Sequence, residues 1–121
     1  MKTILVVDDD ALMLGVMKDA LRREYSITCV SNGQEAQDLL TQEKYDLVIT
    51  DLVMPEMNGI ELLMTLQNND PTQKIIAISG GGGITGRFDY LPVAQLIGAN
   101  NVLRKPFQVA ELRSIVKDLL N

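Results

Sequence analysis

Residues 4–10 read Ile-Leu-Val-Val-Asp-Asp-Asp, an apolar run followed directly by three aspartates. An uninterrupted run of this kind, rich in β-branched residues, is typical of a strand covered on both faces, as strands in parallel sheets are. Four other stretches share this character, at residues 27–30, 47–50, 75–79 and 102–104. The first and last of these four are shorter or more mixed, which predicts that they lie nearer the edges of the sheet.

Segments with helical spacing of apolar residues lie between these strands. The pattern predicts helices at residues 11–23, 34–42, 60–67, 91–97 and 108–120. Strands that alternate with helices form βαβ units with right-handed crossovers, and their helices cover both faces of the sheet. A chain of 121 residues fits one domain, here residues 1–121. The sequence therefore predicts an α/β fold, a doubly wound parallel sheet of five strands with five helices.

The first predicted helix has a clear start and a broad apolar face. Asp10 is a residue type that caps helix N-termini. Two adjacent apolar stripes follow it, one made by Leu12, Val16 and Ala20 and the other by Met13, Met17 and Leu21. This pattern predicts an amphipathic helix that packs against the sheet.

Composition excludes several kinds of site and partner. Sixteen acidic residues against eleven basic ones give a net charge of −5, which argues against nucleic-acid binding. No apolar run is long enough to span a bilayer or to read as a signal peptide, so we expect no membrane partner. The single cysteine, Cys29, is compatible with a reducing cytoplasm, where we expect the protein to act. Because the chain has no histidine, a metal site would use mainly oxygen ligands, which favours Mg²⁺, Ca²⁺ or Mn²⁺ over zinc.

Polar residues end or directly follow four of the five predicted strands. They are Asp8 and Asp9, then Asp51, then Ser79, then Lys105. In an open α/β sheet the carboxyl ends of the strands share one edge, and ligands bind there. Neighbouring carboxylates repel one another, and a hard cation such as Mg²⁺ removes that repulsion. A lysine and a serine can hold phosphoryl oxygens and an aspartate can accept a phosphoryl group, so the set predicts phosphoryl transfer.

Five motifs, in order along the chain, resemble those of response-regulator receiver domains. They are residues 4–10, Asp-Leu-Val-Met-Pro-Glu-Met-Asn-Gly at 51–59, Ile-Ser-Gly at 78–80, Gly-Ala at 98–99 and Leu-Arg-Lys-Pro-Phe at 103–107. The resemblance covers essentially the whole chain. It implies a flavodoxin-like sheet with strand order 2-1-3-4-5. It also implies a phosphoacceptor signalling domain of a two-component system, which takes part in a phosphorelay.

The resemblance implies a metal site and a phosphoacceptor among the aspartates. Asp51 would accept the phosphoryl group. Asp9 and Asp51 would bind Mg²⁺ directly, with Mn²⁺ as a possible substitute, and the backbone carbonyl of Val53 would be a third ligand. Asp8 would act largely through water.

The resemblance also implies how the phosphoryl group is held. Ser79 and Lys105 would contact its oxygens, and the Lys105–Pro106 peptide bond is expected to be cis. The sequence departs from the family at Val102, where an aromatic residue is often found whose rotamer couples to the serine or threonine. We therefore do not carry that coupling over to this chain.

The implied partners are proteins. The phosphoryl group would come from a phosphohistidine on a sensor histidine kinase or a histidine phosphotransfer protein. The change would pass to a face formed by residues 91–120 and from there to a downstream protein or output domain that the sequence does not identify. Such a domain is not an enzyme acting on other molecules, because it catalyses only its own phosphorylation and dephosphorylation.

Two other readings of the acidic residues stay open. The first is a Mg²⁺-dependent phosphatase of the haloacid-dehalogenase type, with Asp8 as nucleophile and Asp10 as acid and base. That pattern prefers a threonine at the position of Leu12. The second is a receiver-like scaffold that binds proteins without being phosphorylated.

A glycine-rich stretch raises one further alternative. Residues 81–86, Gly-Gly-Gly-Ile-Thr-Gly, satisfy the spacing of a dinucleotide-binding fingerprint. That fingerprint should follow the first strand of its βαβ unit, and the next strand should end in an acidic residue. Here the next strand leads into Lys105 instead, which argues against a dinucleotide site.

Overall fold

The computed structural model describes residues 1–52, 59–79 and 91–121. Strands and helices alternate along the described chain in the order β1 (Thr3–Val7), α1 (Ala11–Leu21), β2 (Ser26–Val30), α2 (Gly33–Gln42), β3 (Leu47–Asp51), α3 (Gly59–Asn69), β4 (Lys74–Ser79), α4 (Leu91–Ile97), β5 (Asn101–Arg104) and α5 (Val109–Leu120). Each strand begins and ends within one residue of its predicted bounds, and each helix within two. The predicted α/β alternation is confirmed.

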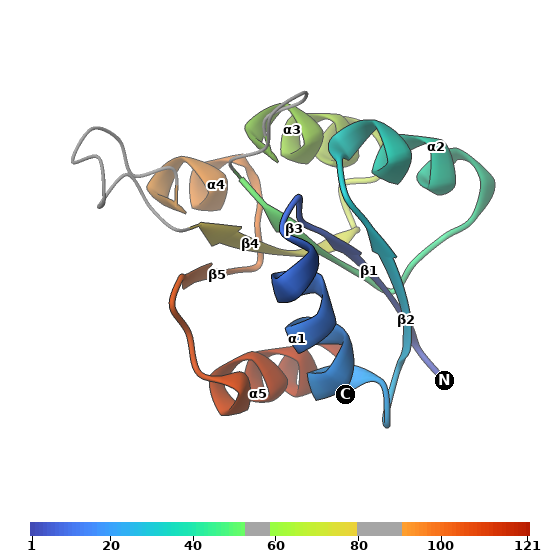
Figure 1. Ribbon diagram of the computed structural model, residues 1–121. Helices are drawn as coiled ribbons and strands as arrows, with labels where there is room; N and C mark the ends of the chain where they lie inside the picture. The colour runs from blue at the N-terminus through green and yellow to red at the C-terminus, as the bar shows by residue number, and fades with distance from the viewer. Residues whose placement is uncertain (53–58, 80–90) are drawn as a thin grey trace.

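The five strands form one parallel sheet in the order β2-β1-β3-β4-β5 (Figure 1). The predicted order 2-1-3-4-5 is therefore confirmed, and β2 and β5 are the edge strands, as their mixed composition indicated. Because parallel strands point the same way, their carboxyl ends lie along one edge of the sheet. The residues that follow β1, β3, β4 and β5 must meet there.

Alternate side chains of the central strands bury two separate cores. Leu5 and Val7 of β1 belong to one core, and Ile4 and Val6 belong to the other. Helices α2, α3 and α4 cover the first core, whereas α1 and α5 cover the second (Figure 1). These four β1 side chains are fully buried, which explains why the run has no polar position. No helix in the described ranges is long and apolar enough to cross a bilayer.

The buried face of α1 is narrower than the sequence predicted. Met17 and Leu21 are buried in the second core, whereas Leu12 is 78% exposed and Val16 is 38% exposed. A helix lying on a sheet turns only part of its circumference inward, so the neighbouring stripe is left toward solvent. The stripe that contains Leu12 is therefore mainly a surface feature.

Both ends of α1 have a local cause. The Asp10 side chain accepts a hydrogen bond from the backbone N–H of Leu12 at 3.0 Å, which confirms the predicted N-cap. The helix ends at Leu21 rather than at residue 23. The carbonyl of Leu21 accepts a hydrogen bond from the N–H of Tyr25 at 3.1 Å, and the chain turns there to bury the Tyr25 ring.

Candidate functional site

Three carboxylates meet at the carboxyl edge of the sheet. Asp8 and Asp9 follow β1, and Asp51 is the last residue of the neighbouring strand β3. One oxygen from each of the three lies within 4.8 Å of the others. Asp8 is fully buried and Asp51 is 6% exposed, whereas Asp9 is exposed. The predicted cluster is therefore formed by adjacent strands, with one carboxylate open to solvent.

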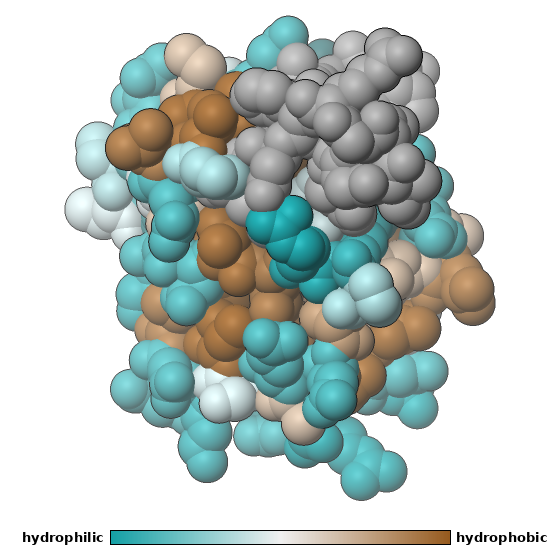
Figure 2. All heavy atoms as spheres, turned by 90° about the vertical axis from the view of Figure 1, so that its left-hand side faces the viewer, coloured by the Kyte–Doolittle hydropathy of each residue, from teal (hydrophilic) through white to brown (hydrophobic). Residues whose placement is uncertain are grey.

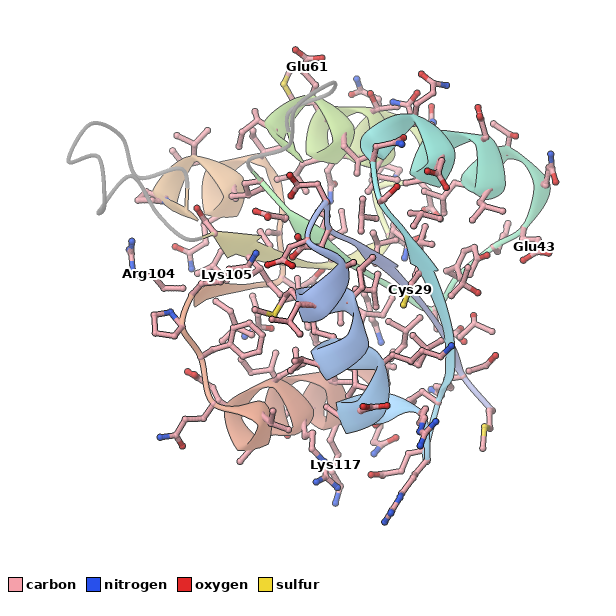
Figure 3. The ribbon with its side chains drawn as sticks, in the orientation of Figure 1. Cys29, Glu43, Glu61, Arg104, Lys105 and Lys117 are labelled. Carbon is pink, nitrogen blue, oxygen red and sulfur yellow. The ribbon has the colours of Figure 1, made fainter. Side chains whose placement is uncertain are left out.

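Lys105 reaches this cluster from the edge strand β5. Its Nζ donates to Asp8 Oδ2 at 2.9 Å and to Asp51 Oδ2 at 3.1 Å. Figure 3 shows the Lys105 side chain directed in over the edge of the sheet, while that of the preceding Arg104 extends away from it. The backbone N–H of Lys105 donates to the carbonyl of Ser79 at 2.7 Å, and the Lys105–Pro106 bond is cis, as predicted. One ammonium group thus joins two carboxylates that come from different strands.

The protonation equilibria of Asp8 and Lys105 reflect this burial. Removal from water raises the pKa of Asp8 above its ordinary value, although hydrogen bonds from the N–H of Asp10 and from Lys105 oppose the change. Burial alone would lower the pKa of Lys105. Its hydrogen bond to Asp8 and the charge of Asp51 outweigh that effect, so the pKa of Lys105 is raised. Lys105 therefore stays charged while it holds the carboxylates.

Ser79 ends β4 at the same edge of the sheet. It is fully buried and pairs in register with Arg104, the residue before Lys105. Its neighbour Ile78 pairs with Asp51, so Ser79 lies one position beyond the phosphoacceptor candidate on the adjacent strand. Strand order and register thus bring the backbone positions of Ser79 and Asp51 to the same edge of the sheet, and Lys105 follows the neighbouring strand. The predicted metal ligand Val53 lies outside the described residues, as does the glycine-rich stretch 81–86.

The donor set fits a hard divalent cation. Every side-chain ligand that the cluster offers is a carboxylate oxygen, which suits Mg²⁺ or Mn²⁺ and does not suit a soft metal. The three acids also carry more negative charge than Lys105 neutralises. Asp8 already uses both oxygens, since Oδ1 accepts from the N–H of Asp10 at 2.9 Å and Oδ2 accepts from Lys105.

Two features of the site were not predicted from the sequence. The first is the contact between Lys105 and Asp8, because nothing in the spacing of two residues 97 positions apart indicates which carboxylate the lysine selects. The second is Thr50, a fully buried hydroxyl that donates to the carbonyl of Asp51 at 2.9 Å. A polar residue at the end of the apolar run 47–50 was the signal that could have identified it.

Comparison with known proteins identifies the family. A family model described as the response regulator receiver domain matches residues 4–117. The chain is 35% identical over 121 residues to the response regulator receiver protein CpdR of Brucella abortus, with 99% of this chain and 98% of CpdR covered. It is 30% identical over 125 residues to the transcriptional regulatory protein CrdR of Helicobacter pylori, with 99% of this chain but 55% of CrdR covered. The chain thus spans about half the length of CrdR and nearly all of CpdR.

A solved structure agrees with these matches. The response regulator protein TrrA of Thermotoga maritima, in complex with Mg²⁺-BeF, superposes with a TM-score of 0.85 and 31% identity. The superposition covers 99% of this chain and all of that one. The predicted resemblance is confirmed on sequence and on fold, and neither the phosphatase nor the dinucleotide reading is supported by these matches. The chain belongs to the response regulator receiver domain family of two-component signalling.

Proposed function

We propose that Asp51 is the phosphoacceptor of a receiver domain that spans residues 1–121. The observation that carries the proposal is the position of Asp51 in the described structure. It is the one carboxylate that both belongs to the cluster of three acids and ends a central strand beside Ser79. Its Oδ2 also accepts a hydrogen bond from Lys105. A nucleophilic oxygen here has the Lys105 ammonium group and two further acids beside it.

The chemistry is a transfer between two covalent phosphoryl carriers. An oxygen of Asp51 attacks the phosphorus of a phosphohistidine on the partner protein and forms a phosphorus–oxygen bond as the phosphorus–nitrogen bond breaks. The electron pair of the broken bond returns to the imidazole nitrogen, which can then take up a proton. The product is an acyl phosphate on Asp51. The domain in this way catalyses its own phosphorylation, with the partner's phosphohistidine as the donor.

We propose that Asp9 and Asp51 hold Mg²⁺ directly, together with the Val53 carbonyl. Asp8 acts through water, because both of its oxygens already accept hydrogen bonds. The exposed Asp9 carboxylate can rotate toward a cation without leaving a buried partner. When bound, Mg²⁺ neutralises the negative charge that gathers on the phosphoryl oxygens. The Mg²⁺-BeF complex of TrrA supports this assignment by analogy.

Phosphorylation gives Lys105 a new anion to contact. The phosphoryl group adds about 1.5 to 2 negative charges at neutral pH and three strong acceptor oxygens. Lys105 and the Ser79 hydroxyl are the described groups that can donate to these oxygens. Because Lys105 holds Asp8 and Asp51 beforehand, its move toward the phosphate changes the contacts of both strands. This exchange of partners is the start of the proposed switch.

The output face lies on α4, β5 and α5. Apolar side chains gather on this face, where Figure 2 shows brown atoms beside and below the hydrophilic atoms near its centre. The described apolar side chains on these elements include Leu96, which is 88% exposed, and the half-buried Ile97, Val102 and Ile115. Val102 packs against the first core, and a valine side chain is smaller than an aromatic ring. We propose that this face binds the downstream partner.

The phosphoryl donor is a histidine kinase or a histidine phosphotransfer protein, since the chain itself has no histidine. The downstream partner is a separate protein or an output domain. A relative such as CrdR, which is nearly twice as long as the matched region, fits the second arrangement, and CpdR fits the first.

The test is phosphorylation with a small-molecule phosphodonor and Mg²⁺, followed by mass measurement. We expect wild type to gain one phosphate, Asp51→Asn to gain none, and the exposed control Asp19→Asn to behave as wild type. Loss of labelling in Asp8→Asn together with full labelling of Asp51→Asn would instead favour the phosphatase reading. Failure of wild type to be labelled by either the small donor or a phosphohistidine protein would leave only the scaffold reading.

A further inference from the structure

The carboxyl-terminal end of α4 is closed by a tight turn. The backbone N–H groups of Gly98 and Ala99 both donate to the carbonyl of Ala94, at 3.1 and 3.0 Å. Gly98 has a φ of 136°, a conformation that side-chain-bearing residues rarely adopt. The turn therefore directs the Gly98 carbonyl away from the helix axis, where another element can reach it.

Gln67 of α3 occupies that position. Its Nε2 donates to the carbonyl of Gly98 at 3.2 Å, and both residues are partly buried. A Cβ atom at residue 98 would lie 2.7 Å from Gln67 Cδ, closer than such atoms approach one another. The glycine and the glutamine thus fit each other, and they fasten the end of α4 to α3.

Asn100 fastens the same end of α4 to the sheet. Its backbone N–H donates to the carbonyl of Ile75 at 2.8 Å, and its side-chain Oδ1 accepts from the N–H of Ile75 at 2.9 Å. Ile75 is the second residue of β4, at the edge of the sheet opposite Ser79. Three hydrogen bonds to α3 and β4 therefore hold residues 98–100 far from the candidate phosphorylation site.

The remainder of α4 is held by side-chain packing. Among the described side chains of the helix, which begin at residue 92, Ala94 is fully buried, Val93 and Ile97 are half-buried, and Gln95 and Leu96 are exposed. A helix of seven residues has little stability of its own, so its position depends on such contacts. Its amino-terminal end lies on the same side of the molecule as the carboxyl end of β4 (Figure 1).

We propose that Gln67 and Asn100 form a fixed pivot for α4. This inference rests on the proposed function: when Ser79 and Lys105 turn to a phosphoryl group, α4 swings about its anchored carboxyl-terminal end instead of sliding as a whole. Gln67 is then a positioning residue, which confines the response of α4 to its amino-terminal end.

The anchor is tested first without any ligand, by amide hydrogen exchange. In wild type we expect the amides of Gly98, Ala99 and Asn100 to exchange more slowly than that of Val93. Gln67→Glu keeps the size of the side chain but removes the donor, and it should speed exchange at residues 98–100 by roughly three- to tenfold, the loss of about one hydrogen bond. The control Asn68→Asp makes the same chemical change at an exposed neighbour and should leave exchange unchanged. Equal exchange in Gln67→Glu and wild type would overturn the anchor.

The pivot is tested by amide chemical shifts on addition of Mg²⁺ and beryllofluoride, the probe present in the TrrA complex. In wild type we expect large changes at Val93 and Ala94 and small ones at residues 98–100, and in Gln67→Glu we expect the changes to extend to residues 98–100. Changes of similar size along all of α4 in wild type would refute the pivot. An absence of response at Asp51 and Ser79 would contradict both the proposed function and the pivot. The exchange measurement would still show whether Gln67 anchors residues 98–100, because it needs no ligand.

Discussion

Lys105 neutralises two carboxylates that have little access to water. Asp8 is fully buried and Asp51 nearly so, and the lysine side chain itself is 18% exposed. Leaving a buried carboxylate without its cation is costly, because the desolvation that the pair had offset remains. The stability of this part of the fold therefore depends on one ammonium group.

The variant Lys105→Met tests this dependence. We expect it to lower the free energy of unfolding by about 3 kcal/mol at neutral pH without Mg²⁺, because Asp8 loses its charged partner. Urea unfolding of variant and wild type measures the difference. Addition of Mg²⁺ should reduce the loss, since a cation in the cluster takes over part of the neutralisation. Lys2→Met, at an exposed lysine, is the control. An equal loss in both variants would show that the buried pair has no special energetic role.

At the scale of elements, burial rather than hydrophobicity decides how much each leucine contributes to the free energy of unfolding. Leu112 of α5 is fully buried in the second core, while Leu12 of α1 is 78% exposed. Both residues are leucines in helices that pack against the same face of the sheet. Because the same substitution to alanine is made in both helices, its effect on helix propensity is matched. The cost of truncation should therefore report packing alone.

We expect Leu112→Ala to lower the free energy of unfolding by about 2 to 5 kcal/mol through lost burial and a residual cavity. Leu12→Ala should change it by less than about 0.5 kcal/mol. Chemical denaturation of the two variants measures both values. A large loss in Leu12→Ala would mean that the exposed stripe of α1 is covered in solution.

The turn between α3 and β4 contains a carboxylate with a lowered pKa. The hydroxyl and the N–H of Thr72 donate to Asp70 Oδ1 at 2.6 and 2.9 Å, and these hydrogen bonds hold the pKa of Asp70 below its ordinary value. Such a carboxylate stabilises the fold above its unfolded-state pKa, near 3.8, and this contribution is lost as the pH falls through its folded-state pKa.

Thr72→Val should therefore destabilise the protein at neutral pH, and the difference from wild type should shrink as the pH is lowered toward about 3. The comparison is a series of urea unfolding curves across that range. Thr41→Val is the matched control, because the Thr41 hydroxyl donates to a backbone carbonyl that does not titrate. A Thr72→Val difference that stays constant with pH would mean that the hydroxyl acts without the charge of Asp70.

At the scale of the molecule, the parallel sheet gathers distant residues at one edge. Asp8, Asp51 and Lys105 are separated by long stretches of chain, yet each follows or ends a strand, and the strand order places them together. The carboxylates that repel one another come from β1 and β3. A cation that binds between them therefore stabilises the folded arrangement, in which the two strands are adjacent. Binding of a ligand at a hundred times its dissociation constant stabilises a protein by about 2.7 kcal/mol.

Mg²⁺ should accordingly raise the midpoint of thermal unfolding in wild type. Asp51→Asn should abolish most of that increase, because it removes one of the charges in the cluster, and Asp19→Asn should preserve it. Thermal melts at increasing Mg²⁺ concentration provide the measurement. The same increase in all three proteins would place the cation away from the candidate site.

The sequence predicted the elements well because each is specified locally. The run at residues 4–7 is apolar throughout and becomes a fully buried strand, and Asp10 supplies a side chain that caps α1. The set Asp8, Asp9, Asp51, Ser79 and Lys105 was also within reach of sequence reasoning, because the carboxyl ends of parallel strands share an edge. The individual roles of these five residues in phosphoryl transfer stay predictions.

By itself the sequence determined the alternation of strands and helices, the convergence of polar residues at one edge and the family. Only the tertiary structure decided which stripe of α1 is buried, which carboxylates Lys105 joins and how Gln67 meets the Gly98 carbonyl. The physical reason is how far apart along the chain the interacting residues lie. Strand and helix periodicity, capping and charge act between residues close together in the chain. Three features depend on residues that are far apart in the chain: exposure, the choice of an ion-pair partner and the fit of a side chain against a glycine. No local sequence pattern records such features.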